Sequence, residues 1–385
     1  MSVCSGGSRD KSFTVVMRGP SAVVFRQSDQ LRAEGFPSDA GPVNIVYQSR
    51  WLRADSEVTV PGHLWVEVSG KGASLDQSLR AFPQAGLALL PVLSLSANAA
   101  IGDPELELGF DSTQGAGERD YFQSNLPPER GGLMYVARYI DSNVTVALVD
   151  AIKRHPERER LLRAAEQYRL ALGFWERGGE TLSLAHLWMA LETLTKPKIT
   201  AERQIRGMCP EEDLASALGV SLERGWKREL HAAVRKDLLL HGDGECYRKA
   251  KKARNGLEHG YLDFGEIREL SGDVRPRVAG HVRTAILELS GVEGKALKVL
   301  TEDPFHEPLG HWAPAKYLRG RLVGDNSELA REGHAYPFVR WKTTITKCRT
   351  RDDGQLDIEC AEEFTPELAE GITFQPVSLK VLKRD

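Results

Sequence analysis

The chain has 385 residues, of which 41% are hydrophobic and 27% are charged. This length favours two or three domains over one core, and this composition is typical of a soluble globular protein and excludes a disordered one. The net charge is −3, from 51 basic and 54 acidic residues. No overall basic field marks a nucleic-acid coat or a membrane binder, so an anionic ligand must be held by a local patch.

Targeting signals and cysteine usage both indicate a cytoplasmic protein. No apolar run approaches the about 20 residues of a membrane span, and the segment MSVCSGGSRDKS at the start lacks the apolar core of a signal peptide. The five cysteines are far apart and form no C-x-x-C pair: Cys4, Cys209, Cys246, Cys348 and Cys360. We therefore expect reduced thiols, no membrane association and neither a disulfide nor a zinc framework.

The first third of the chain alternates short β-like runs with turn residues. Strands are predicted over four runs that are rich in β-branched and aromatic residues, at 13–17, 22–26, 43–47 and 63–68. A helix over 75–82 and an apolar stretch over 86–101 follow. Residues 105–110 alternate with period two, as in a half-buried strand, and 114–132 resemble a long loop. We assign residues 1–142 to a mixed β/α domain with a sensing or regulatory role.

Near residue 144 the apolar period changes to that of an α-helix. Five amphipathic helices are predicted, over about 156–178, 184–195, 226–238, 244–257 and 278–289. Each apolar stripe is about 100° wide, which is typical of helices that share one bundle core. Pro156 suits a first turn, and Lys196-Pro197 is expected to end the second helix. Residues 143–295 are therefore predicted to form an all-α bundle.

The last part of the chain is loop-like with short β runs. Residues 341–350 and 356–360 alternate on either side of Arg351-Asp352-Asp353-Gly354, which is an Asp-Gly hairpin signal, and a last β run covers 378–382. Residues 296–385 are assigned to a loop-rich β appendix. The predicted fold class is α+β multidomain: a central all-α helical bundle flanked by the mixed β/α region and the small β appendix.

Several well-known catalytic motifs are absent from the sequence. There is no phosphate loop, no G-x-S-x-G elbow, no H-E-x-x-H helix and no Rossmann glycine fingerprint. His241, Cys246 and Cys209 would hold a metal only if three scattered residues met in the fold. The sequence therefore predicts neither a metal nor a cofactor.

One stretch, YRKAKKARNGLEHG over residues 247–260, concentrates positive charge beside a histidine. Residues 221–260 contain ten Lys and Arg against six Asp and Glu, a local net charge of +4. Such a field attracts an anionic substrate and stabilises charge in a phosphate transition state. Four cations are interpreted as a solvated face that guides RNA phosphates: Arg248, Lys249, Lys251 and Lys252.

Arg254, Asn255 and His259 are the candidate catalytic residues. They supply a guanidinium for a phosphate, an amide to orient it, and an imidazole for proton transfer. Residues five apart in a helix are rotated by about 140°, so Arg254 and His259 would not face one point. Either the helix ends or bends at Gly256 and Gly260, or two copies of the chain bring one Arg to the other's His.

Arg254-Asn255-x-x-x-His259, at the end of a helix in an all-α bundle, resembles the signature of the HEPN superfamily (higher eukaryotes and prokaryotes nucleotide-binding domains). That signature is Arg, a polar residue, and then His, with four to six residues between the Arg and the His. The resemblance implies a four- to five-helix bundle that dimerises and combines two motifs in one site. It also implies metal-independent RNA cleavage, in which the 2′-hydroxyl attacks the adjacent phosphate. His259 would be the general acid/base, Arg254 would hold the scissile phosphate, and Asn255 would orient the substrate.

Two glutamates are candidates for supporting this site. Glu192, in the second predicted helix, would pair with Arg254 if it faced the bundle, although an ordinary solvent-facing glutamate is the favoured alternative. Glu258 lies between Asn255 and His259. Trp175, Trp188 and Trp226 lie on helical stripes and are interpreted as core residues.

Three functional hypotheses follow. The first is a homodimeric endoribonuclease acting on RNA as a toxin or phage-defence effector, with a regulatory protein partner. The second is a non-catalytic HEPN dimerisation and RNA- or nucleotide-binding module that works with a partner protein. A third rests on residues 97–104, 118–122 and 253–260, which are similar to bacterial methylamine-utilisation (MauJ-like) proteins and imply a small-molecule protein of amine metabolism.

Overall fold

The computed structural model describes residues 11–53, 59–114, 118–124, 138–208, 210–302, 305–310, 315–326, 328–334, 337–350 and 356–382. The chain forms two compact units. Unit 1 comprises residues 1–50, 63–127 and 138–311, and unit 2 comprises residues 51–62, 128–137 and 312–385. Unit 1 includes both the strands of the N-terminal region and the helices, so the boundary expected at 142/143 lies inside it. The mixed α+β class is confirmed.

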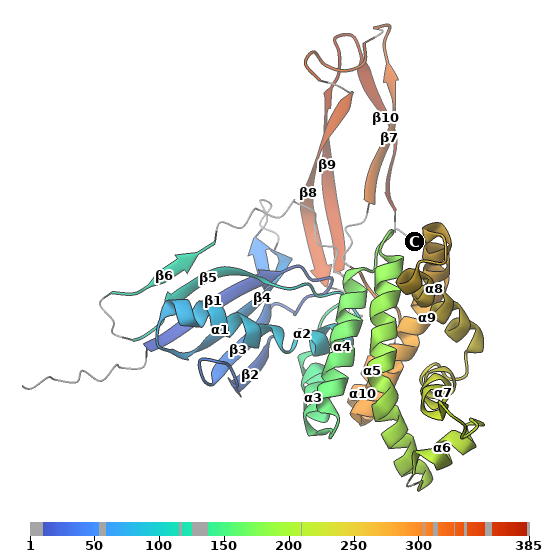
Figure 1. Ribbon diagram of the computed structural model, residues 1–385. Coiled ribbons are helices and arrows are strands. Elements are labelled where there is room, and N and C mark those ends of the chain that lie inside the picture. The colour runs from blue at the N-terminus through green and yellow to red at the C-terminus, as the bar shows by residue number, and fades with distance from the viewer. Residues whose placement is uncertain are drawn as a thin grey trace, which may run out of the picture. The chain divides into compact units, whose positions relative to one another are not determined.

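The N-terminal strands form one six-stranded antiparallel sheet in the order β2-β3-β4-β1-β5-β6 (Figure 1). The strands are β1 (Lys11–Gly19), β2 (Leu31–Phe36), β3 (Val43–Arg53), β4 (Thr59–Gly72), β5 (Glu105–Asp111) and β6 (Tyr121–Gln123). In the central strand β1, Val15 lies opposite Val68 of β4 and Gly109 of β5. The strands predicted over 13–17, 43–47, 63–68 and 105–110 are confirmed.

The strand predicted over 22–26 is wrong. In the structure this segment forms only isolated bridges, from Ser21 to Ile101 and from Val24 to Tyr139. Val23, Val24 and Phe25 are fully buried, so this irregular segment contributes its apolar side chains to the core. The β-branched and aromatic residues here reflect burial and not pairing with a neighbouring strand. The edge strand β2 lies in the next segment.

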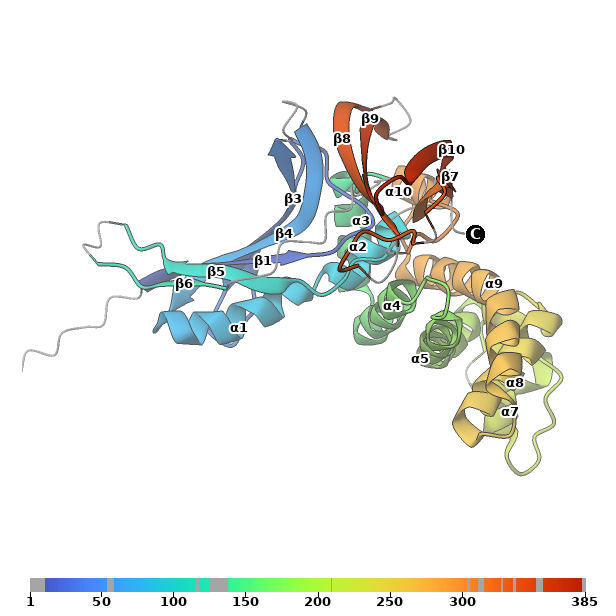
Figure 2. The same cartoon turned by 90° about the horizontal axis from the view of Figure 1, so that it is seen from above.

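Helices α1 (Leu75–Leu87) and α2 (Leu90–Ala97) lie between β4 and β5 in the chain, and α1 covers one face of the sheet (Figure 2). The Ser74 side chain caps α1 by accepting from the Gln77 amide. Among the described residues, one stretch, Leu75–Ala97, is long and apolar enough to cross a membrane, but 67% of its most apolar window is buried within the protein. Its apolar side chains therefore serve as core.

The remaining helices of unit 1 form the predicted helical region. They are α3 (Ser142–Arg154), α4 (Arg158–Gly173), α5 (Glu180–Arg206), α6 (Glu211–Ala217), α7 (Trp226–Ala233), the π-helix η1 (Val234–Leu239), α8 (Gly244–His259), α9 (Phe264–Ser290) and α10 (Gly294–Thr301). Helix α5 packs between α4 and α9, and α8 packs on α9 and α5. All five predicted helices are present, and α10 lies where the sequence indicated a loop.

The expected end of the second helix at Pro197 is wrong, because α5 continues to Arg206. Proline removes one backbone donor and disfavours a helix interior. Here Thr195, Pro197 and Ile199 are all buried, so tertiary packing of this stretch outweighs the local cost. The helix ends instead at Gly207, whose φ of 66° is the left-handed conformation typical of a C-terminal cap.

Buried arginines join α2 to the helical region. Arg283 of α9 donates to the carbonyls of Leu95 and Ser96, and Arg138 donates to those of Ala97 and Asn98. These carbonyls lie at the negative end of α2, where cations are favourable. Within unit 1, these two guanidiniums therefore hold the end of α2 against α9 and the segment that precedes α3.

Unit 2 contains two two-stranded antiparallel sheets. One pairs β7 (Ala315–Val323) with β10 (Thr373–Leu382), and the other pairs β8 (Phe338–Thr350) with β9 (Leu356–Glu367). The pairing predicted between 341–350 and 356–360 is confirmed, and the run 378–382 lies in β10. The Asp-Gly turn at 351–354 lies outside the described residues.

Candidate functional site

Helix α8 carries the candidate motif and is closed at both ends. At its start, the Asp243 carboxylate accepts from the Cys246 amide at 3.0 Å, and at its end Gly260 adopts a φ of 64° and returns its amide to the carbonyl of Gly256. These are ordinary N-terminal and C-terminal caps. The helix therefore runs two residues beyond the predicted end at 257, to His259.

Arg254 is held by two carboxylates. Its guanidinium lies 2.6 Å from Glu258 Oε2, one turn along α8, and 3.7 Å from Glu192 Oε1 on α5. A third contact runs from Nη1 to Asn255 Oδ1 at 3.1 Å, while the buried Nε has no hydrogen-bond partner among the described residues. Glu192 is exposed, as the favoured alternative expected, and it nevertheless lies within ion-pair distance of Arg254. Arg254 is half-buried, so its orientation is fixed by the α5–α8 contact.

His259 is the last residue of α8 and its side chain is exposed. No hydrogen bond or ion pair joins it to another residue in the described part of the chain. Since α8 is continuous from Arg254 to His259, the two side chains are rotated by about 140° around the helix axis. One chain alone does not bring both groups to one point.

The helix break considered at Gly256 is therefore wrong. A Cβ added at Gly256 would lie 2.7 Å from Leu262 Cδ1 and 3.0 Å from its Cγ. The missing side chain makes room for Leu262, which folds back over the end of the helix. Gly256 is thus a packing glycine and α8 passes through it as a helix.

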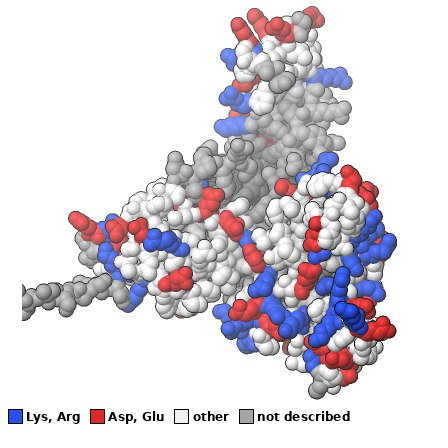
Figure 3. Space-filling view, viewed as in Figure 1, with Lys and Arg blue, Asp and Glu red and all other residues white. Residues whose placement is uncertain are grey.

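The four predicted RNA-binding cations differ in their surroundings. Lys249 lies 2.8 Å from Glu245 and 2.7 Å from Asp273, and Lys252 lies 2.6 Å from Glu266. These acids neutralise both lysines. Arg248 and Lys251 are exposed and form no ion pair with a described residue. Figure 3 shows basic and acidic side chains interspersed over the helical part of unit 1.

Two buried aromatic rings connect Glu192, the ion-pair partner of Arg254, to two further cations. Trp188 of α5 donates from Nε1 to Glu192 Oε1 at 2.9 Å, and its ring lies 5.8 Å from that of Tyr247 on α8. The Arg235 guanidinium, on η1, lies over Trp188 at 5.8 Å, and Lys251 Nζ lies over Tyr247 at 5.9 Å. Trp188 is core, as predicted.

Sequence reasoning missed Arg235 and Tyr247 as neighbours of this site. Tyr247, Lys251, Arg254 and Glu258 are separated by four, three and four residues, so one face of α8 carries all of them. That spacing was present in the sequence and identifies Tyr247. Nothing in the sequence indicated η1, so Arg235 was visible only in the fold.

The residues considered for a metal lie at the other end of α8. His241 Nδ1 lies 3.1 Å from His281 Nδ1, and Asp243 lies 3.9 Å from His281 and 3.1 Å from Arg277. Cys246 is buried, which raises the pKa of its thiol to about 11, and Cys209 lies outside the described residues. Within the described ranges, no group of three or more His, Cys, Asp or Glu side chains is arranged to hold a metal ion.

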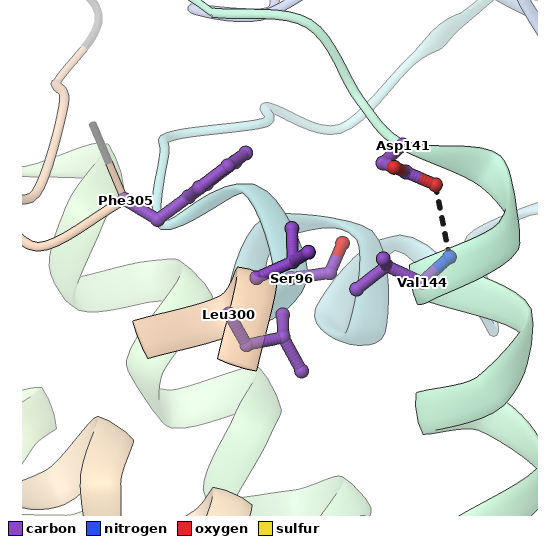
Figure 4. A pocket seen from close by; sticks show the side chains of 6 residues that line it. Ser96, Asp141, Val144, Leu300 and Phe305 are labelled. Carbon is purple, nitrogen blue, oxygen red and sulfur yellow. Dashed lines mark hydrogen bonds between the residues drawn. The ribbon is translucent and has the colours of Figure 1, made fainter. Parts of the chain in front are cut away.

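A small pocket lies elsewhere in unit 1, between α2, α3 and α10 (Figure 4). Its walls are Val144, Val299, Leu300 and Phe305, with Ser96 and Asp141 as polar groups. The Asp141 carboxylate accepts from the Val144 amide and so caps α3, and the Ser96 hydroxyl bonds Thr145. Both polar groups serve the fold, so the motif face of α8 remains the candidate site.

Comparison with known proteins gives no relative. No protein-family model, no curated protein and no solved structure matches this chain.

Proposed function

We propose that this protein is a metal-independent endoribonuclease of the HEPN type. The observation that carries the proposal is the arrangement at the end of α8, where Arg254 is tethered to α5 through Glu192 and His259 is exposed on the last helical turn. A fixed guanidinium and an accessible imidazole are the groups that RNA cleavage without a metal requires.

The proposed reaction uses the RNA 2′-hydroxyl as nucleophile. Its oxygen forms a bond to the adjacent phosphorus while the bond to the 5′-oxygen breaks, which leaves a cyclic phosphate end. His259 acts as general acid/base for the proton that leaves the 2′-hydroxyl and the proton that the 5′-oxygen gains. Arg254 holds the charged phosphate oxygens, and Asn255 orients the substrate.

A homodimer through the helical bundle completes the proposed site. The 140° rotation separates Arg254 from His259 within one chain, and a two-fold axis would bring Arg254 of one copy to His259 of the other. Exposed apolar side chains beside His259 support such an interface: Leu257 is 38% exposed, Tyr261 56% and Phe264 63%. Side chains of this kind are typically covered at a protein–protein interface.

We place this activity in the cytoplasm, as a toxin or phage-defence effector acting on RNA. The N-terminal sheet region would serve sensing or regulation, with a regulatory protein partner.

The test is cleavage of a mixed single-stranded RNA pool by purified protein in EDTA, with analysis of the ends. Wild type should leave cyclic phosphates, His259→Ala and Arg254→Ala should each lose at least about 100-fold in rate, and a DNA pool should resist because it lacks the 2′-hydroxyl. Equal cleavage by wild type and His259→Ala would overturn the proposal.

One observation favours a second candidate, a non-catalytic dimerisation and RNA- or nucleotide-binding module that works with a partner protein. The Arg254 guanidinium is occupied by Glu192 and Glu258, so its charge is partly neutralised before a phosphate arrives. This candidate predicts binding of RNA or nucleotide without turnover in the same assay.

A further inference from the structure

The cations around α8 fall into two classes according to their partners. Lys249, Lys252 and Arg254 each lie within 2.8 Å of at least one carboxylate oxygen. A phosphate that approaches these groups must compete with an acid already in place. Arg235 and Lys251 form no ion pair with any residue in the described segments, so each carries a full unpaired charge.

Arg235 and Lys251 are instead positioned by aromatic rings. Together with Trp188 and Tyr247 they form a row: guanidinium, ring, ring and ammonium, with successive distances of 5.8, 5.8 and 5.9 Å. Trp188 is 4% exposed and Tyr247 is 8% exposed, so these rings are not free to stack on bases. A cation over a ring keeps its charge while the contact limits its side-chain freedom.

This aromatic row leads directly to the proposed catalytic arginine. Trp188 and Glu192 are one turn apart on α5 and share a hydrogen bond, and the same Glu192 oxygen pairs with Arg254. On α8, Tyr247, Lys251 and Arg254 lie on one face. Arg235 comes from η1, and π-helical turns are rare and frequent at functional sites. The two unpaired cations are therefore connected to Arg254 from separate helices, Arg235 through Trp188 and Glu192, and Lys251 along the same face of α8.

We propose that Arg235 and Lys251 form a subsite for the RNA phosphates next to the scissile phosphate. The inference rests on the proposed function, in which Arg254 holds the scissile phosphate, and names the residues that hold its neighbours. Each unpaired cation releases counterions from the RNA when it binds, whereas an ion-paired lysine first has to lose its acid. Lys249 and Lys252 consequently contribute less to RNA binding than two unpaired cations would. Arg248 is also unpaired but lies about 120° around α8 from Arg254, outside the subsite.

The test measures binding of a fluorescent single-stranded RNA whose 2′-hydroxyls are methylated, so that cleavage does not interfere. The dissociation constant is determined over a series of salt concentrations for wild type, Arg235→Gln and Lys251→Gln. Each variant should lower the slope of log affinity against log salt by about 0.7, the value for one phosphate contact on a single strand. Lys249→Gln and Lys252→Gln are matched controls, and each should leave the slope near that of wild type.

Arg235→Lys keeps the charge and should restore most of the slope, which separates charge from folding, and thermal melting checks that each variant is folded. If wild type binds with a salt-dependent slope and Arg235→Gln and Lys251→Gln leave it unchanged, the subsite is wrong while the nuclease proposal still depends on the cleavage assay. If wild type does not bind RNA at all, both are overturned. Binding that depends on the two cations without cleavage by wild type would keep the subsite and remove the nuclease.

Discussion

Arg254 Nη2 on α8 and Glu192 Oε1 on α5 lie 3.7 Å apart, and this pair joins two residues that are about sixty positions apart in the sequence. Glu192 also accepts a hydrogen bond from the buried Trp188, so a core residue positions the carboxylate that pairs with the guanidinium. The position of Arg254 is therefore determined by tertiary packing, while His259 is positioned by the end of its own helix.

A composite site between two copies makes a specific prediction for mixed mutants. Arg254→Ala and His259→Ala are each expected to be inactive alone. Mixed in equal amounts and allowed to exchange subunits, they should recover about a quarter of wild-type cleavage, because half of the dimers are mixed and each mixed dimer has one intact pair. The measurement is initial cleavage rate against mixing ratio. Recovery that stays at the level of the separate mutants would exclude a site shared between copies.

Removal of the acid nearest Arg254 should strengthen RNA binding. Glu258 lies 2.6 Å from the guanidinium, and a helix pair four residues apart contributes about 0.3–0.5 kcal/mol. Glu258→Gln should therefore increase affinity for an uncleavable RNA about twofold. Glu269→Gln is the matched control, since it removes the same charge from an exposed position on α9. An equal gain in both variants would assign the effect to net charge rather than to Arg254.

Two helical glycines should respond to alanine with opposite signs. At Gly256 a Cβ would lie 2.7 Å from Leu262 Cδ1, whereas at Gly280 of α9 it would meet no atom within 4 Å. Gly256→Ala should cost about 1–2 kcal/mol of unfolding free energy through overpacking. Gly280→Ala should gain about 0.5–1 kcal/mol, because alanine loses less backbone entropy in a helix. Denaturant titration of both variants measures the difference, and a stabilised Gly256→Ala would contradict the packing role.

The contact between His241, just before α8, and His281 of α9 should make stability fall in acid. Burial lowers the pKa of His281 below its ordinary value of 6.5, and the nearby charge of His241 lowers it further, against the opposing effect of Asp243. The unfolded chain therefore binds this proton more readily than the folded chain. The stability that the neutral His281 contributes is fully present above the ordinary pKa of 6.5. It is lost as the pH falls from 6.5 through the lower pKa of the folded state.

The measurement compares melting temperatures at about pH 7.5 and pH 5.5. The acid-induced decrease should be smaller in His281→Gln than in wild type. His334→Gln, at an exposed position of unit 2, should leave the decrease unchanged. A His281→Gln variant with the same decrease as wild type would show that this histidine does not govern the response.

Much of the fold follows from local pattern. The alternation over residues 105–110 predicted β5, and the 3.6-residue period predicted α4, α7, α8 and α9, because a single buried face leaves its period in the sequence. Prediction failed in two segments whose burial depends on tertiary packing rather than on a local pattern. The segment 22–26 is apolar because it fills the core, and α5 continues through Pro197 because its neighbours are buried.

The sequence by itself determined the motif, the contiguous charge run and a helix over about 244–257, because all three are local patterns. The structure extends that helix by two residues to His259, between caps at Asp243 and Gly260. Only the tertiary structure decided which charges are free. Ion pairs with α5 and α9 neutralise Arg254, Lys249 and Lys252, while the rings of Trp188 and Tyr247 position Arg235 and Lys251. The reason is that only some partners, such as Glu245 of Lys249, Glu258 of Arg254 and Tyr247 of Lys251, lie four residues away on α8. The others come from helices that are distant in the chain, and helical periodicity contains no information about which helix packs against which.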